Sequence, residues 1–165
     1  MLTFLQKGQK IAVIGSSDTH NPPRVENANG RAVGVPTTNV DMKKLSQTEL
    51  LAAIKNGRVW ISDSPTNYSL EFSAFNGSRI NIGEASASLN GKIRLDCTVK
   101  NLPVGATVFL ISNGQVLQKD KIENAEYIFA KEFSVEKDSY FRLEARNEKG
   151  SMLVLTNPIF VSVKK

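Results

Sequence analysis

Apolar and polar residues alternate in short runs through the C-terminal two thirds of the chain. Every second side chain is apolar in residues 93–100 (IRLDCTVK) and 141–146 (FRLEAR), which predicts strands with one buried face. Asn113-Gly114 separates two apolar runs and predicts a hairpin with a type I′ turn. Further strands are expected near residues 69–75, 126–134, 152–156 and 159–163. Six or seven short antiparallel strands in about 100 residues predict an immunoglobulin-like or fibronectin-like β-sandwich.

The first 40 residues follow a different pattern. Residues 11–14 (IAVI) form a continuous apolar run, which predicts a strand buried on both faces of a parallel sheet. Lys7-Gly8 before it resembles the end of a helix with a glycine cap. Residues 33–40 (VGVPTTNV) predict a short strand, and Pro36 indicates either the edge of a sheet or an irregular stretch. These are the last elements expected of an α/β unit.

One helix is predicted over residues Gln47–Asn56. Ser46 and Glu49 have the spacing of a capping box, and Gly57 provides the C-terminal stop. Pro65 ends the strand expected after this helix. We therefore expect two units, an α/β fragment at residues 1–65 and a β-sandwich at residues 66–165.

Composition and charge narrow the functional classes. The net charge of +5 is spread along the chain without a basic run, so we expect a mildly basic surface and no binding to nucleic acid. No apolar run approaches the roughly 20 residues of a membrane span, and residues 1–10 are too short and too polar for a secretory signal. Cys97 is the single cysteine, which excludes an internal disulfide and leaves the compartment open. Its place on the apolar side of a strand indicates a small core residue.

Asp18 and His20 are the candidate metal ligands. They follow the apolar run 11–14, at the position where α/β folds place catalytic side chains. Residues i and i+2 of an extended chain point to the same side, so a carboxylate oxygen and an imidazole nitrogen can face one metal ion. The alternative is that Asp18 caps a turn and His20 is an ordinary loop residue. Asp41 and Asp63 have no spacing that marks them as ligands and are expected in turns or on the surface.

Three consecutive segments carry a more specific signal: residues 11–20 (IAVIGSSDTH), 33–40 (VGVPTTNV) and 52–65 (AAIKNGRVWISDSP). Together they resemble the C-terminal third of the PHP (polymerase and histidinol phosphatase) domain, in the branch of metallohydrolases whose β/α barrel is followed by a β-sandwich. Residues 156–159 (TNPI) also resemble the last strand of such sandwiches. The matching residues are Gly15, Ser17, Asp18 and His20, then Gly34, Pro36, Thr38 and Val40, then Ala53, Ile54, Gly57, Arg58, Ser62 and Pro65.

The resemblance implies a metal-dependent phosphoesterase of which this chain is the C-terminal part. Asp18 and His20 would be ligands of a centre of two or three divalent metal ions (manganese, zinc or iron) that activates water against a phosphate ester. The family's other ligands come from earlier strands, and His20 is the sole histidine of this chain. We therefore expect the N-terminal remainder of the barrel as a partner, and little metal binding or activity by the chain alone. Arg24 and Arg31 could contact a substrate phosphate, or could be exposed loop arginines.

Two other roles stay open. The sandwich could be a binding module, for a partner or a carbohydrate, without catalysis. It could equally be structural and cover the end of the barrel. An isolated barrel end exposes a strand edge and an apolar face, so we expect residues 1–64 to pack on the sandwich or two copies to associate.

Overall fold

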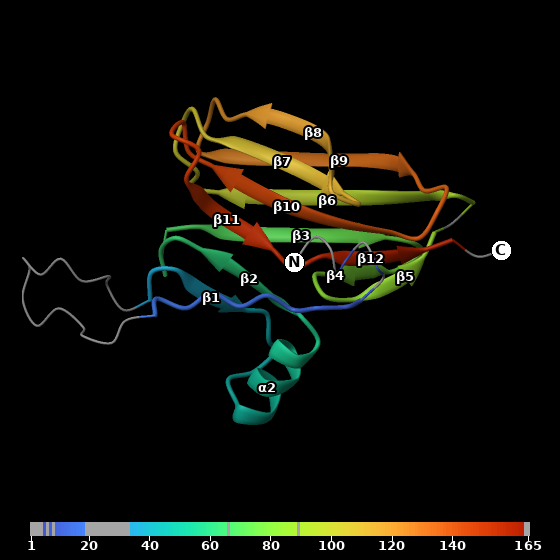
Figure 1. The fold of residues 1–165 in the computed structure, drawn as a ribbon, viewed down its shortest axis with the longest axis horizontal. Coiled ribbons are helices and arrows are strands. Elements are labelled where there is room, and N and C mark those ends of the chain that lie inside the picture. The colour runs from blue at the N-terminus through green and yellow to red at the C-terminus, as the bar shows by residue number, and fades with distance from the viewer. Residues whose placement is uncertain are drawn as a thin grey trace, which may run out of the picture.

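The computed structural model describes residues 5, 7, 9–18, 34–65, 67–88 and 90–163, and this part of the chain is mainly β. Within these residues twelve strands form two sheets, and helix α2 (Gln47–Lys55) protrudes below them in the view of Figure 1. The strands are β1 (Thr37–Val40), β2 (Val59–Ser62), β3 (Ser69–Phe75), β4 (Arg79–Asn81), β5 (Ala85–Ala87), β6 (Lys92–Lys100), β7 (Thr107–Ser112), β8 (Gln115–Lys121), β9 (Glu126–Ser134), β10 (Ser139–Arg146), β11 (Met152–Thr156) and β12 (Ile159–Ser162).

The larger sheet has eight strands and is organised around β10. The order runs β1-β2-β11-β10-β12-β5, with β7 on the other side of β10 and β8 beyond β7. Strands β11 and β12 pair with β10 one after the other, β12 with its first residues and β11 with its last. The smaller sheet has the order β4-β3-β6-β9. All these pairings are antiparallel except that of β12 with β5.

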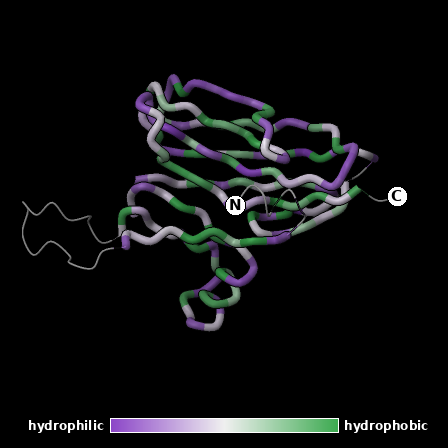
Figure 2. The backbone as a smooth tube through the Cα atoms, viewed as in Figure 1, coloured by the Kyte–Doolittle hydropathy of each residue, from purple (hydrophilic) through white to green (hydrophobic). Residues whose placement is uncertain are grey.

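The two sheets enclose one apolar core. Both contribute fully buried side chains, among them Leu95 of β6, Leu110 of β7 and Ile159 of β12. Cys97 is part of this core, as its place in the alternation predicts. The outer strand β8 consists mainly of hydrophilic residues (Figure 2). In the strands that line the core, hydrophobic and hydrophilic residues alternate. Burial of alternate apolar positions is thus what holds the layers together.

The expected strands at residues 93–100 and 141–146 are confirmed as β6 and β10. Asn113 and Gly114 connect β7 and β8 with φ of 49° and 83°, the left-handed pair that a type I′ turn requires. The helix is confirmed as α2, and the Ser46 hydroxyl accepts a hydrogen bond from the Glu49 amide at 3.2 Å. The strand expected within residues 33–40 is confirmed as β1, which lies at the edge of its sheet.

The prediction of a buried strand at residues 11–14 is wrong. Residues 9–18 belong to no strand, and the side chains of residues 11–18 alternate between partly buried and exposed. The segment instead lies along β1 and β2 and is held by side-chain hydrogen bonds. The apolar run predicted a fully buried strand, but among the described residues the run is only partly buried and belongs to neither sheet. The helix end expected at Gly8 lies outside the described residues.

Residues on both sides of the expected boundary at residue 65 share one sheet. Strand β2 pairs with β11, with Val154 opposite Ser62 and Thr156 opposite Trp60. The turn after α2 also contacts the β4–β5 connection, because Gly57 and Gly83 pack backbone to backbone. The expected packing of the N-terminal residues on the sandwich is therefore confirmed for the described residues that join them.

Candidate functional site

The segment that leads to Asp18 is held at Val13 by one side chain of the sandwich. The backbone N–H of Val13 donates to Oδ1 of Asn157 at 2.7 Å, and Nδ2 of Asn157 donates to the Val13 carbonyl at 3.0 Å. A carboxamide offers an acceptor and two donors in one plane, so it can replace a neighbouring strand at a single residue. Asn157 therefore pairs with Val13 in the way that a β-strand would.

Asn157 occupies this place because the chain leaves the sheet between β11 and β12. The residue is 2% exposed, and its Nδ2 also donates to the Val59 carbonyl at 3.1 Å. Next to it, the Thr156 hydroxyl accepts a hydrogen bond from the Leu143 amide at 2.9 Å. One buried side chain thus joins the N-terminal segment, β2 and the β11–β12 connection.

A second side chain holds the segment two residues further on. The hydroxyl of Thr38 accepts from the Gly15 amide at 2.8 Å and donates to the Gly15 carbonyl at 2.8 Å. A Cβ atom on Gly15 would lie 2.9 Å from Cγ2 of Ile61, so the close approach needs glycine. We call Thr38 and Asn157 together the backbone clamp, because both bind main-chain groups of the segment.

Asp18 follows the clamped residues by three positions. It is exposed, it has a left-handed φ of 50°, and its amide donates to the Ser16 hydroxyl at 3.3 Å. The other residues of the expected site, namely His20, Arg24 and Arg31, lie outside the described residues.

Asp63 was expected in a turn or on the surface, but one of its carboxylate oxygens is buried. Within the described part of the chain, Oδ1 of Asp63 has no hydrogen-bond partner. Partial burial raises the pKa of the neighbouring Tyr68 hydroxyl, and the charge of Asp63 raises it further. The sequence carried no signal for this, because the burial results from packing at the end of β2. Among the described residues, no three His, Cys, Asp or Glu side chains lie close enough together to hold a metal ion.

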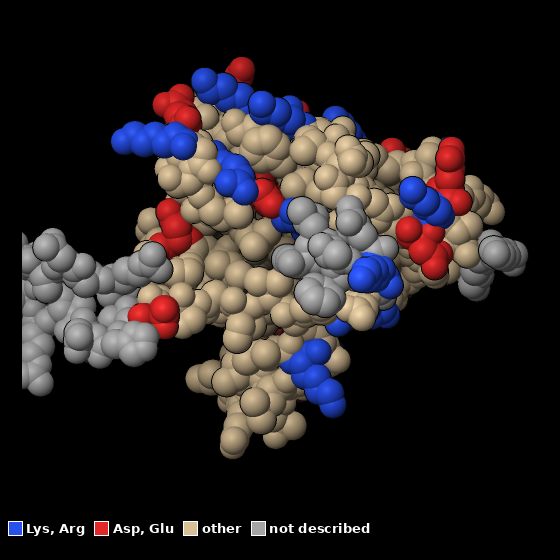
Figure 3. Space-filling view, in the orientation of Figure 1, with Lys and Arg blue, Asp and Glu red and all other residues tan. Residues whose placement is uncertain are grey.

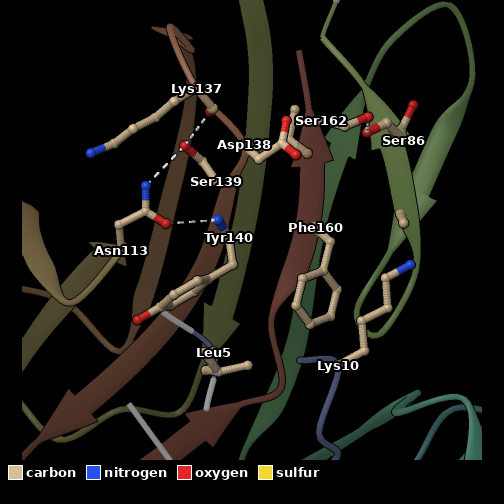
Figure 4. A pocket seen from close by; sticks show the side chains of 12 residues that line it. Leu5, Lys10, Ser86, Asn113, Lys137, Asp138, Ser139, Tyr140, Phe160 and Ser162 are labelled. Atoms are coloured by element: carbon tan, nitrogen blue, oxygen red, sulfur yellow. Dashed lines mark hydrogen bonds between the residues drawn. The ribbon is translucent and has the colours of Figure 1, made fainter. Parts of the chain in front are cut away.

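A cavity of about 550 Å³ opens on the sandwich beside the N-terminal segment (Figure 4). The rings of Tyr140 and Phe160 line it, and Lys10 places its ammonium 5.5 Å from the centre of the Phe160 ring. The Asn113 side chain at its rim donates to the Ser139 hydroxyl at 3.0 Å and accepts from the Tyr140 amide at 3.3 Å. These residues come from strands far apart in sequence, so no local motif could have indicated the cavity.

A second groove, of about 690 Å³, lies on the other side of Lys10. Its walls come from the N-terminal segment, the turn after α2, the β4–β5 region and the β11–β12 connection. Four basic residues and one acidic residue line it, namely Lys10, Lys55, Arg58, Arg79 and Glu84. The groove is therefore more basic than the chain as a whole.

The fold and these sites define a mainly β protein of two sheets with an N-terminal segment clamped onto the larger one. The sequence matches no protein-family model, and a search of curated proteins finds no match. Within the described residues, none of the helical structure has the length and apolar character needed to cross a bilayer.

Proposed function

We propose that this chain is the C-terminal part of a PHP-type metal-dependent phosphoesterase, in which Asp18 and His20 are two ligands of a metal site completed by other residues. The observation that carries the proposal is the backbone clamp. Thr38 and Asn157 belong to the segments that resemble the family, and both act on the residues that lead to Asp18. The resembling segments around Val13, Thr38 and Asn157 are thus in direct contact, although they lie far apart in sequence.

The backbone clamp fixes the position of the chain just before Asp18. Gly15 is fixed to Thr38, so only two residues, Ser16 and Ser17, separate the anchored backbone from Asp18. Ligands of a metal centre need positions set by surrounding hydrogen bonds, and a ligand on an unsupported tail would lower the affinity. A divalent ion held there would lower the pKa of a bound water and neutralise charge on a phosphoryl group.

The surface around this segment supports a further partner. Ile14, Leu45 and Leu51 are 58%, 92% and 58% exposed, and all three belong to the first 65 residues. Helix α2 protrudes from the sheets, and no other element of the described part of the chain covers its outer side (Figure 1). Exposed apolar groups on a helix and on an extended segment favour coverage by another structural unit. We propose the N-terminal remainder of the barrel as that unit, with association of two copies as the alternative.

In this proposal the sandwich is a structural platform. Its own strand connection supplies Asn157, and its sheet supplies the partner strand of β2. The sandwich therefore supports the metal-binding segment without contributing a ligand.

Metal binding by Asp18 tests the proposal directly. Manganese is titrated into the wild-type chain, an Asp18→Asn variant and an Asp41→Asn control, and free manganese is followed by electron paramagnetic resonance. Two protein ligands predict weak binding, with a Kd of about 0.1–1 mM. We expect Asp18→Asn to weaken it about tenfold and Asp41→Asn to leave it unchanged. Equal manganese binding by the wild type and the Asp18→Asn variant, or equal weakening in both variants, would contradict the proposal.

A second candidate function is a binding module, and the cavity beside Phe160 favours it. An aromatic ring next to hydroxyl and carboxylate groups is suited to a compact polar ligand such as a carbohydrate. A carbohydrate array with the wild-type chain and a Phe160→Ala variant tests it. Binding that depends on Phe160 would support this function, and an array without hits would count against it.

A further inference from the structure

The basic groove beside Lys10 is formed where four separate segments meet. Residues 10–12, residues 55–58, the β4–β5 region and the link between β11 and β12 all line its volume of about 690 Å³. This groove is distinct from the position of Asp18. Ala12 is its last lining residue in the N-terminal segment, and six extended residues span about 20 Å.

Five charged residues line the groove, and four of them are basic. The basic residues are Lys10, Lys55, Arg58 and Arg79, and the acidic one is Glu84. Oε2 of Glu84 accepts a hydrogen bond from the Asn81 amide at 2.7 Å. That bond directs the acidic charge toward the β4–β5 turn. On the face shown in Figure 3, basic side chains gather beside α2 and β5.

The ion pairs of the two arginines are weak. Arg58 approaches Glu49 only to 3.9 Å, although its side chain is 18% exposed. Arg79 lies 3.3 Å from Glu71, with both side chains more than half exposed. The exposed Arg79 pair contributes little stabilisation and the Arg58–Glu49 contact is long, so both guanidinium groups remain available to another anion.

Two glycines on neighbouring turns are among the residues that line the groove. Gly57 and Gly83 pack against each other with φ of 71° and 84°, and a Cβ atom on Gly83 would lie 2.5 Å from the Gly57 carbonyl carbon. Neither Ile11 nor Ala12 donates its backbone N–H to a partner within the described residues. Small residues, unpaired amides and excess positive charge together are the chemistry that recognises an oxyanion.

We propose that this groove binds a small organic phosphate. Arginine and lysine side chains at its rim would contact the phosphate oxygens, and the remaining volume accommodates a small organic group. This inference is independent of the metal site. It assigns a ligand to a surface that the proposed phosphoesterase function does not use.

Calorimetric titration with pyrophosphate, at about 20 mM salt to limit screening, tests the inference. The groove variant is Lys10→Ala/Lys55→Ala. The control is Lys92→Ala/Lys121→Ala, which removes the same charge from β6 and β8, where the lysines pair with Glu132 and Glu148. We expect saturable binding by the wild type, at least about tenfold weaker binding by the groove variant and a change below about twofold in the control.

Two results would overturn the inference. One is the absence of saturable binding by the wild type at about 10 mM pyrophosphate. The other is equal weakening in both variants, which would show that only the net charge matters. Amide chemical shifts of the wild type provide a second measurement. Changes centred on Ala12, Gly57 and Gly83 would support the groove, and changes confined to other residues would contradict it.

Discussion

The side chain of Asn157 binds both backbone polar groups of Val13, a residue 144 positions earlier in the chain. Together with the bond to the Val59 carbonyl, this single carboxamide satisfies one donor and two acceptors of the main chain. All three bonds are made by a residue that is 2% exposed. The last connection of the sandwich and the first described segment of the chain therefore form one unit.

Replacement of Asn157 by Ala should lower the free energy of unfolding by about 2–4 kcal/mol, because buried backbone groups would lose their partners. Asn157→Asp should be at least as damaging, since it places a carboxylate against the Val13 and Val59 carbonyls. Urea unfolding measures the change. Asn124→Ala at an exposed position is the control and should change stability by less than about 0.5 kcal/mol. Equal stability of the Asn157 variants and the wild type would show that the bonds contribute nothing.

Thr38→Val should release Gly15 while it leaves the global stability nearly unchanged. Valine has almost the shape of threonine but neither donates nor accepts a hydrogen bond. We expect the Gly15 amide to exchange with solvent about five- to tenfold faster. Hydrogen exchange followed by nuclear magnetic resonance measures this rate. Thr38→Ser keeps the hydroxyl and should restore most of the protection. Unchanged exchange in Thr38→Val would exclude the clamp at this position.

Gly83→Ala should destabilise the fold by about 2–4 kcal/mol, because its methyl group would collide with the Asn56–Gly57 backbone. Gly150→Ala is a matched control. Gly150 has a similar φ of 82°, but no atom lies within 4 Å of the added methyl group, so about 1 kcal/mol is expected. The two melting temperatures measure the difference. Similar losses in both variants would show that backbone strain alone is responsible.

Glu144 should make part of the stability dependent on pH. Burial alone would raise its pKa, but the hydrogen bonds and charges of Arg142 and Arg146 outweigh burial and lower the pKa below its ordinary value. Solvent screens this ion pair only weakly, because the Arg142 and Glu144 side chains are 8% and 12% exposed. The nitrogen and oxygen atoms of the pair lie 2.5 Å apart. The contribution is therefore complete above the unfolded pKa of about 4.3 and is lost as the pH falls through the lower folded value.

Glu144→Gln tests this dependence through unfolding measured from pH 7 to pH 3. The variant should be less stable than the wild type by about 2 kcal/mol at pH 7, and the difference should shrink below about pH 4. Glu136→Gln at an exposed position should show no such trend. A stability difference that stays constant over the whole range would mean that the carboxylate charge is not involved.

The sequence alone predicts the secondary-structure elements that depend on local patterns. The alternation in residues 93–100 predicts β6, Asn113-Gly114 predicts the β7–β8 turn, and Ser46 predicts the start of α2. Each of these three features depends on the conformational preferences of residues that are adjacent in the sequence. The immunoglobulin-like identity of the sandwich and its relation to a PHP barrel stay predictions.

The sequence was insufficient where distant segments meet. The run at residues 11–14 indicated a strand, but its true partners are the side chains of Thr38 and Asn157. Both cavities join loops and strands from opposite ends of the chain, and the buried oxygen of Asp63 depends on its packing. No local spacing encodes such contacts. The candidate ligand His20 is outside the described residues, so the metal site stays a prediction as well.

The backbone clamp also determines which substitutions the N-terminal segment tolerates. Thr38 and Asn157 bind N–H and carbonyl groups, which every residue except proline provides. A library of substitutions at Val13 should therefore retain folding with many side chains and exclude proline. Gly15 should accept almost none, because Ile61 leaves no room for a Cβ atom. The permissive position and the strict one are only two residues apart, and neither pattern would follow from hydrophobicity.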